Sequence, residues 1–167
     1  MPEALEIINR VISEHRAIRE HVKLAGDTVN DVEALFSLQR AQAGWSQASI
    51  TAITEKRDQL IQTIHFLERG LRSHFGFEER ELPPLFGEML MKALLHEHRE
   101  IGKQVETAKT ALDNMQLEGL DQKELLSKKA TMQKDISDLG QAVEEHAYRE
   151  EVILNMMKRA LEENKAK

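Results

Sequence analysis

The sequence has no cysteine, only three prolines and few aromatic residues, which make up 4% of the chain. Without cysteine the chain cannot form disulfides, thiolate metal sites, iron–sulfur clusters or cysteine-attached haem. Any metal that it binds must therefore have nitrogen and oxygen ligands. Few prolines, eight glycines and no long β-branched alternation indicate long helices.

The chain also lacks an apolar run of the roughly 20 residues that a membrane-spanning helix needs. Its formal net charge is −6 without a basic block, so nucleic acid and anionic membranes are poor partners. The amphipathic, partly acidic N-terminal segment does not resemble a signal peptide. We therefore expect a cytoplasmic protein whose residues 1–167 form a single domain with a real core.

Four long segments carry apolar residues at helical spacing. Short connections between such helices make neighbours antiparallel, so we expect an all-α, up-down-up-down four-helix bundle. The expected helices cover residues 2–40 with a bend near 26–27, 47–81 with a local bend near Gly70 and Gly76, 86–116, and 122–163.

The expected breaks have local chemical reasons. Residues 41–46 form a connection, after which Ser46 or Ser49 can cap the second helix. Pro83 and Pro84 should end that helix, since a helix cannot run through them. The last break contains Gly119, and Asp121 can cap the helix that follows.

Each expected helix has one histidine in its apolar stripe, and two of them also have a glutamate four residues later, one turn along the same face. A buried carboxylate is costly without a positive partner, and two close together repel. Two cations would remove both difficulties, so the pattern predicts a binuclear metal site in the bundle core. The candidate ligands are His15, His74, Glu78, His98, His146 and Glu150.

A weak internal repeat supports this pattern. Residues 14–22 (EHRAIREHV) match 97–105 (EHREIGKQV), and residues 74–82 (HFGFEEREL) match 146–154 (HAYREEVIL). Each half thus supplies a histidine from one helix and a His-x-x-x-Glu pair from the next. A pseudo-twofold bundle would bring the two half-sites face to face.

A single histidine in an apolar stripe is more often a hydrogen-bonded core residue than a ligand, so the prediction depends on the complete set. His21, His65 and His96 fall outside the stripes and should face solvent. Five glutamates flank the ligands and should mostly face outward, with one or two accepting a ligand N–H. These are Glu14, Glu79, Glu97, Glu145 and Glu151.

Imidazole and carboxylate ligands suit iron, manganese, zinc or copper. Structural zinc is usually mononuclear and tetrahedral, whereas six ligands with two bridging carboxylates favour two metals about 3.5–4 Å apart. Four aromatic residues are candidates to line or gate this site, although the two phenylalanines are also typical packing residues. They are Trp45, Phe75, Phe77 and Tyr148.

The six candidate ligands, in this order and spacing, resemble the hemerythrin HHE cation-binding family over essentially the whole chain. The resemblance implies a non-haem site of two Fe ions, bridged by Glu78, Glu150 and an oxo or hydroxo group. It further implies that one iron is held by His15 and His146, and the other by His74 and His98.

Oxygen-carrying members of that family have a further histidine four residues after the one in their third helix, where this chain has Gly102. They also bridge through an aspartate five residues after the last histidine, whereas here the bridge candidate is Glu150, four residues after it. Both irons would then keep an open position, which favours reaction with O2, NO or peroxide over reversible carriage. The pattern is closer to bacterial di-iron proteins of nitric-oxide stress and iron–sulfur repair, whose cysteine-containing N-terminal domain this sequence lacks.

Three functions remain open at this level. The first is a di-iron protein that binds and reacts with O2, NO or peroxide, as an oxidoreductase supplied by a redox partner protein. The second is iron storage, iron delivery or sensing without turnover. The third is a structural or interaction bundle whose histidines are incidental. The oligomeric state is not predicted.

Overall fold

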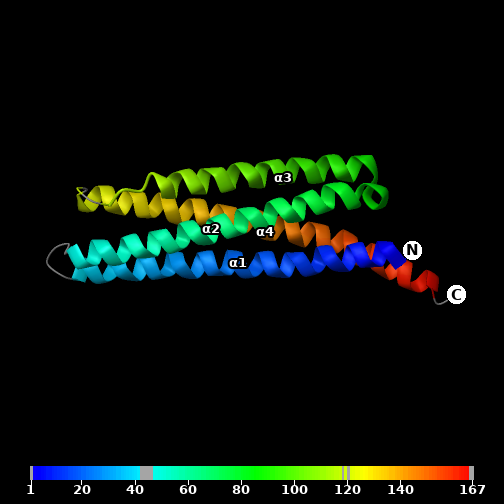
Figure 1. Ribbon diagram of the computed structural model, residues 1–167, viewed down its shortest axis with the longest axis horizontal. Helices are drawn as coiled ribbons and strands as arrows, with labels where there is room; N and C mark the ends of the chain where they lie inside the picture. Colours follow the sequence, from blue (N-terminus) through cyan, green and yellow to red (C-terminus); the bar gives the residue numbers. More distant parts are fainter. Residues whose placement is uncertain (1, 42–46, 118, 120, 166–167) are drawn as a thin grey trace.

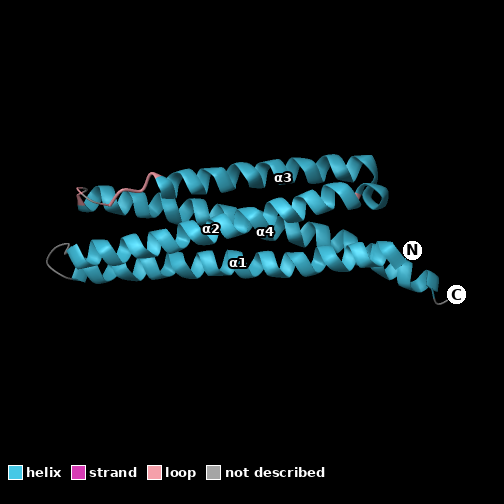
Figure 2. Ribbon diagram, viewed as in Figure 1, coloured by secondary structure: helices cyan, strands magenta, loops and turns pink. Residues whose placement is uncertain are grey.

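A computed structural model describes residues 2–41, 47–117, 119 and 121–165 of the chain. Four helices run back and forth, and each packs against two neighbours in the order α1, α2, α3, α4 and back to α1 (Figure 1). Figure 2 shows helix throughout the described segments apart from short turns. The predicted up-down-up-down four-helix bundle is confirmed. The helices are α1 (Pro2–Ala41), α2 (Gln47–Glu81), α3 (Pro83–Asp113) and α4 (Gln122–Lys165).

The start of α4 follows the predicted cap. The Asp121 carboxylate accepts a hydrogen bond from the Glu124 backbone N–H at 2.8 Å, and the Glu124 carboxylate accepts one from the Asp121 N–H at 2.9 Å. This reciprocal capping box satisfies two N–H groups that have no partner within the helix. The other predicted cap, Ser46, lies outside the described residues, and Ser49 lies inside α2.

The boundaries of α3 differ from the prediction. The helix begins at Pro83 rather than near 86, because prolines lack only N–H groups that the first turn does not use. Gly87 then interrupts it with a positive φ of 70°, a conformation that suits glycine, and marks a kink. At its other end α3 stops at Asp113, before the predicted residue 116, and a turn at Asn114 follows.

The described helices continue through the glycines where bends were predicted. α1 runs on through Gly26, and α2 runs on through Gly70 and Gly76. Gly140 has a different role, since a Cβ atom there would lie 3.2 Å from the Val22 side chain. This close approach lets α4 pack tightly against α1.

The apolar core is divided into two clusters. The larger one fills the end of the bundle that contains Phe36, Leu60 and Leu139, and the smaller one fills the other end around Ile8, Phe77 and Leu154. A layer of buried polar side chains from all four helices lies between them. Within the described chain, no helix is both long enough and apolar enough to cross a bilayer.

Candidate metal centre

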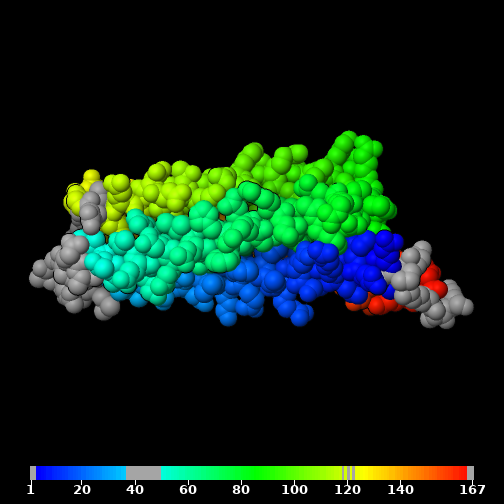
Figure 3. Space-filling view, in the orientation of Figure 1, coloured from blue at the N-terminus to red at the C-terminus, as the bar shows by residue number. Residues whose placement is uncertain are grey.

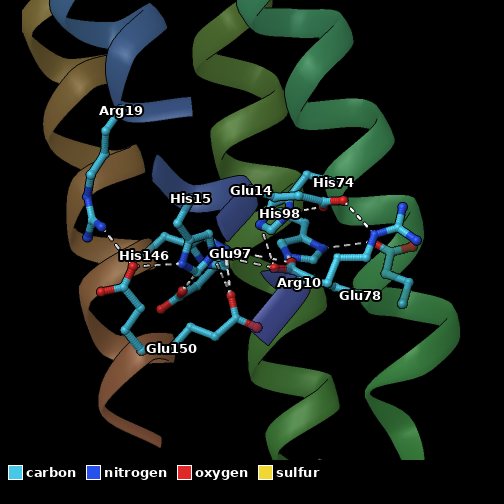
Figure 4. Close-up of polar contacts among 12 residues, drawn as sticks. Arg10, Glu14, His15, Arg19, His74, Glu78, Glu97, His98, His146 and Glu150 are labelled. Atoms are coloured by element: carbon cyan, nitrogen blue, oxygen red, sulfur yellow. Dashed lines mark hydrogen bonds and ion pairs between the residues drawn. The ribbon is translucent and has the colours of Figure 1, made fainter. Parts of the chain in front are cut away.

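The polar layer consists of the predicted ligand set. All six side chains are buried, at 5% exposure or less, and Figure 4 shows them directed toward one another from the four helices. α1 and α3 contribute one histidine each, while α2 and α4 contribute a histidine and a glutamate each. The predicted candidates, His15, His74, Glu78, His98, His146 and Glu150, are thus all brought together.

Glu78 is the centre of this cluster. Its Oε1 lies 2.5 Å from His74 Nε2 and 3.5 Å from His15 Nε2. Its Oε2 lies 3.0 Å from His98 Nε2 and 4.0 Å from His146 Nε2. One carboxylate therefore contacts the histidines of all four helices.

Glu150 contacts only two of the histidines. Its Oε2 lies 3.3 Å from His15 Nε2 and 3.4 Å from His146 Nε2. Donor atoms of these three residues and of Glu78 all lie within 4.8 Å of one another, close enough to hold a metal ion. The remaining pair, His74 and His98, shares Glu78, and within the described chain no second carboxylate contacts their Nε2 atoms.

The donor atoms of the cluster fit bound cations. Among the described residues, nine buried side-chain nitrogen or oxygen atoms lack a hydrogen-bond partner, and eight of them belong to this cluster. They are the Nε2 atoms of the four histidines and both carboxylate oxygens of Glu78 and Glu150. Buried polar atoms are rarely left unsatisfied, so their convergence on one point is the pattern expected of metal ligands.

A ring of outer glutamates holds the four imidazoles. Each helix supplies the glutamate that accepts the Nδ1–H of the next helix's histidine, and Figure 4 labels two of these glutamates, Glu14 and Glu97. The pairs are His74 with Glu14 at 2.8 Å, His98 with Glu79 at 2.8 Å, His146 with Glu97 at 2.7 Å and His15 with Glu151 at 3.1 Å. A proton fixed on Nδ1 leaves the Nε2 lone pair free and aimed inward.

More glutamates bind the ligand histidines than the sequence predicted, since only one or two of the five flanking glutamates were expected to accept a ligand N–H. Four do so, and the fifth, Glu145, instead contacts Gln141 and Arg149. The four share a signal that could have identified them. Each directly follows a ligand glutamate or directly precedes a ligand histidine, and each has a glutamate at the matching position of the other half, whereas the residue that matches Glu145 is Ser73.

Arginines tie three of the four outer glutamates in place. Arg10 donates to Glu14 at 2.8 Å, and Arg149 donates to Glu97 at 2.8 Å. Glu151 accepts from Arg19 at 2.7 Å, and the same guanidinium also reaches Glu144. Within the described chain, Glu79 has no such partner.

The burial and proximity of these groups shift their protonation equilibria in this metal-free cluster. Burial disfavours charge on Glu78, but the surrounding histidines outweigh it and hold the pKa of Glu78 well below its usual range. Burial raises the pKa of Glu150 to about 7, with the Glu78 charge adding to the effect of burial and His15 opposing it. Burial opposes charge on His15 as well, yet Glu150 and Glu78 raise its pKa to about 9.

The other histidines stay outside the cluster, as predicted. His65 and His96 are exposed, and His21 is half-buried with its ring against the carbonyl of Ala17 on its own helix. None of the three has a contact with the six candidate ligands among the described interactions.

The aromatic candidates divide among three environments. Phe75 stacks on the His98 ring with centroids 3.8 Å apart and an interplanar angle of 12°. Phe77 is buried in the smaller apolar cluster, and Tyr148 is exposed. Trp45 lies outside the described residues.

The comparison with protein families agrees with this geometry. The family model described as the hemerythrin HHE cation binding domain matches residues 6–158, which include all six candidate ligands and the four outer glutamates. No curated protein and no solved structure matches the chain. Because the match covers most of the sequence, the chain belongs to the hemerythrin HHE cation-binding family.

Proposed function

We propose that this cation-binding domain holds two irons and that the loaded site binds, and reacts with, O2, NO or peroxide. The observation that carries the proposal is the set of eight buried donor atoms without hydrogen-bond partners, all directed at one centre. Four imidazoles and two carboxylates are ligands that iron accepts, and two trivalent or divalent cations would balance the buried negative charge.

The contacts favour one assignment of ligands to metals. Glu78 reaches all four histidines, so it would bridge the two positions. His15, His146 and Glu150 lie together and would complete one position. His74 and His98 would complete the other. This division of the histidines is the one that the family resemblance implies, whereas the contacts of Glu150 favour one position over the bridging role that the resemblance implies for it.

The chain's own residues prepare the site for that chemistry. The outer glutamates keep each Nδ1 protonated and each imidazole in one orientation, so that little reorganisation is needed on loading. The two apolar clusters above and below keep water away from the buried carboxylates. When bound, the iron pair supplies redox chemistry and an open coordination position for a small ligand.

Gly102 supports a reactive rather than a saturated site. It stands one turn after His98, where a further imidazole could otherwise reach the metal position of His74 and His98. Because Gly102 has no side chain, the metal position of His74 and His98 would have two histidines and the shared Glu78 as its protein ligands. Solvent or an exogenous ligand would complete its coordination.

Iron storage or delivery is the competing function. Delivery requires that an acceptor can reach the metal, yet all six ligands are buried and four of them are fixed by outer hydrogen bonds. This burial supports retention of the metal. Sensing without turnover remains compatible with the same geometry and is distinguished by kinetics.

The test is to load the anaerobic, reduced chain with Fe(II), count metals by mass spectrometry and expose it separately to O2, NO and peroxide. We expect about two irons per chain and a change in the visible spectrum with at least one of the three. Repeated turnover with peroxide or NO would identify an oxidoreductase, and a single reversible change would identify a sensor. Iron that is bound without any spectral response to the three molecules would refute the reactive site.

A further inference from the structure

A groove of about 530 Å³ lies between α2 and α3, directly beside the cluster. Its walls include the apolar side chains of Leu71, Ile101 and Val105, and His98 and Phe75 lie at one end. The boundary between these two helices runs along the face of the molecule shown in Figure 3. The volume is that of sites that take small organic ligands.

Both ends of the groove are closed by polar links between the two helices. At one end Lys109 on α3 contacts Glu68 on α2 at 3.0 Å. At the other end His98 on α3 donates to Glu79 on α2 at 2.8 Å. The open stretch spans 11 residues of α2, or about 16 Å at the helical rise. A groove that is closed at both ends and of this length fits a small molecule rather than a docked helix.

Two glycines open the groove. Gly76 and Gly102 line it, and a Cβ atom at either position would meet nothing within 4 Å. Neither has the positive φ that would require glycine, and glycine inside a helix is destabilising. Backbone geometry and close packing therefore do not explain these two residues, whereas an open wall beside His98 does.

The internal repeat shows what would otherwise occupy this space. Aligning residues 97–105 with 14–22 places Gly102 opposite Arg19, the arginine that ties Glu151 in the other half. Aligning residues 74–82 with 146–154 places Gly76 opposite Tyr148. The groove thus appears where glycines at the α2–α3 junction replace two large side chains found at the matching α4–α1 junction.

The charges at the rim indicate the kind of ligand. Glu68 pairs with Arg72 and Lys109, Glu106 pairs with Lys109, and Glu79 accepts a hydrogen bond from His98. Arg99 also lines the groove and is exposed, and it has no ion-pair or hydrogen-bond partner among the described residues. Among the charged residues that line the groove, Arg99 is the side chain without an ion-pair or hydrogen-bond partner within the described chain, so its guanidinium can pair with an anion.

We infer that this groove binds a small organic anion with a planar apolar body, which lies against Phe75 while its negative group pairs with Arg99. The Phe75 ring already stacks on the His98 imidazole at 3.8 Å, so it offers a flat surface for such a body. The ligand would sit beside the His74–His98 metal position without displacing a protein ligand. Its binding goes beyond the proposed iron chemistry and requires no metal.

The test uses 2-naphthoate as the probe and its neutral analogue 2-naphthylmethanol, titrated against the full chain by ligand-observed NMR, with and without iron. We expect saturable 2-naphthoate binding that is weakened by Gly102→Leu at least about tenfold, because the new side chain fills the groove. Arg99→Gln should weaken 2-naphthoate by about two- to fivefold and leave 2-naphthylmethanol unchanged.

Gly70→Leu is the matched control. Gly70 lies on α2 with free space around it but does not line the groove, so the same substitution should leave binding unchanged. Equal binding to the wild type and Gly102→Leu, or no saturable binding in either iron state, would overturn the inference. Dimerisation abolished by Gly102→Leu, with no probe binding, would overturn it in favour of a second copy of the chain. Because the probe needs no metal, either failure leaves the di-iron proposal untouched.

Discussion

The α2–α3 junction and the α4–α1 junction each join one half of the repeat to the other at matching positions, yet only their inner parts are alike. In each, a histidine is held by a glutamate of the preceding helix. At the α4–α1 junction Arg19 crosses the surface and ties that glutamate, Glu151. At the α2–α3 junction the corresponding residue is Gly102, and Glu79 stays 42% exposed above an open groove.

This difference shows that the six candidate ligands and the residues outside them are under different structural constraints. Every ligand position is occupied in both halves, because a missing donor would leave buried charge unbalanced. The outer layer tolerates replacement of Arg by Gly, since an exposed ion pair contributes about 0–1 kcal/mol. One junction can therefore open toward solvent while the other stays covered.

The largest expected effect separates the two carboxylates. Glu78 contacts all four histidines and Glu150 only two, so Glu78→Ala should abolish binding of both metals. Glu150→Ala should retain about one metal per chain, held by Glu78 with His74 and His98. Metal counting by mass spectrometry after desalting checks this. Equal losses in the two variants would show that the halves are equivalent.

The next effect distinguishes the histidines. His98→Ala should empty the position that has one carboxylate and leave about one metal in the position of His15, His146 and Glu150. His146→Ala should do the reverse and leave the weaker position loaded. His65→Ala is the control, because this exposed side chain lies outside the cluster and its loss should not change the metal content. A metal content lowered by His65→Ala would contradict the ligand assignment.

The sequence alone predicts the parts of this arrangement that depend on local interactions, and it misses parts that depend on contacts between helices. The helical stripes and the spacing of four residues are local, so they predict the bundle and the convergence of all six residues on one layer. The ring of outer glutamates depends on which helices are neighbours, and only part of it was expected. The kink at Gly87 and the groove at Gly102 depend on how side chains fill space between helices, which periodicity does not report.

The outer glutamates should have intermediate effects. Glu151→Gln keeps the shape of the side chain but removes the charge that holds Nδ1–H of His15, so metal affinity should fall by about 10- to 100-fold. The loss of metal affinity in Glu79→Gln should lie at the lower end of that range, because Glu79 is more exposed and solvent screens its charge. Competition with a metal chelator measures both. A larger loss for Glu79→Gln would reverse the inferred order of the two junctions.

The stability of the metal-free protein should depend on pH through Glu150 and His15, the pair at the α4–α1 junction. The pKa of Glu150 is raised to about 7 and that of His15 to about 9, so the folded state holds protons that the unfolded chain would release. Stability from such groups is present below their unfolded pKa values and is lost as pH rises through the folded ones. The loss due to Glu150 is complete near pH 7, and the loss due to His15 extends from about pH 6.5 to 9, so the melting temperature should fall toward pH 9.

Glu150→Gln removes one of these two groups and weakens the shift of the other, so its melting temperature should depend less on pH across this window. Bound metal displaces the same protons, so the increase in melting temperature on loading should grow with pH. Differential scanning calorimetry of metal-free and loaded samples provides both curves. A melting temperature of the metal-free wild type that stays flat or rises over this window would contradict the assigned shifts.

The smallest expected effect comes from making the open junction resemble the closed one. Gly102→Arg restores the residue type found at the matching position 19 and should pair with Glu79, which has no arginine or lysine partner among the described residues. The helix gains about 0.5–1 kcal/mol from losing glycine, and an exposed ion pair adds at most about 1 kcal/mol. The melting temperature of the metal-free protein should therefore rise by about 2–6 °C, as measured by circular dichroism. Gly70→Arg, on α2 and outside the groove, reports the helix contribution alone. An identical rise in the two variants would mean that the new arginine forms no stabilising ion pair with Glu79. The absence of a guanidinium at this junction would then be a consequence of the groove and would not weaken the support of His98.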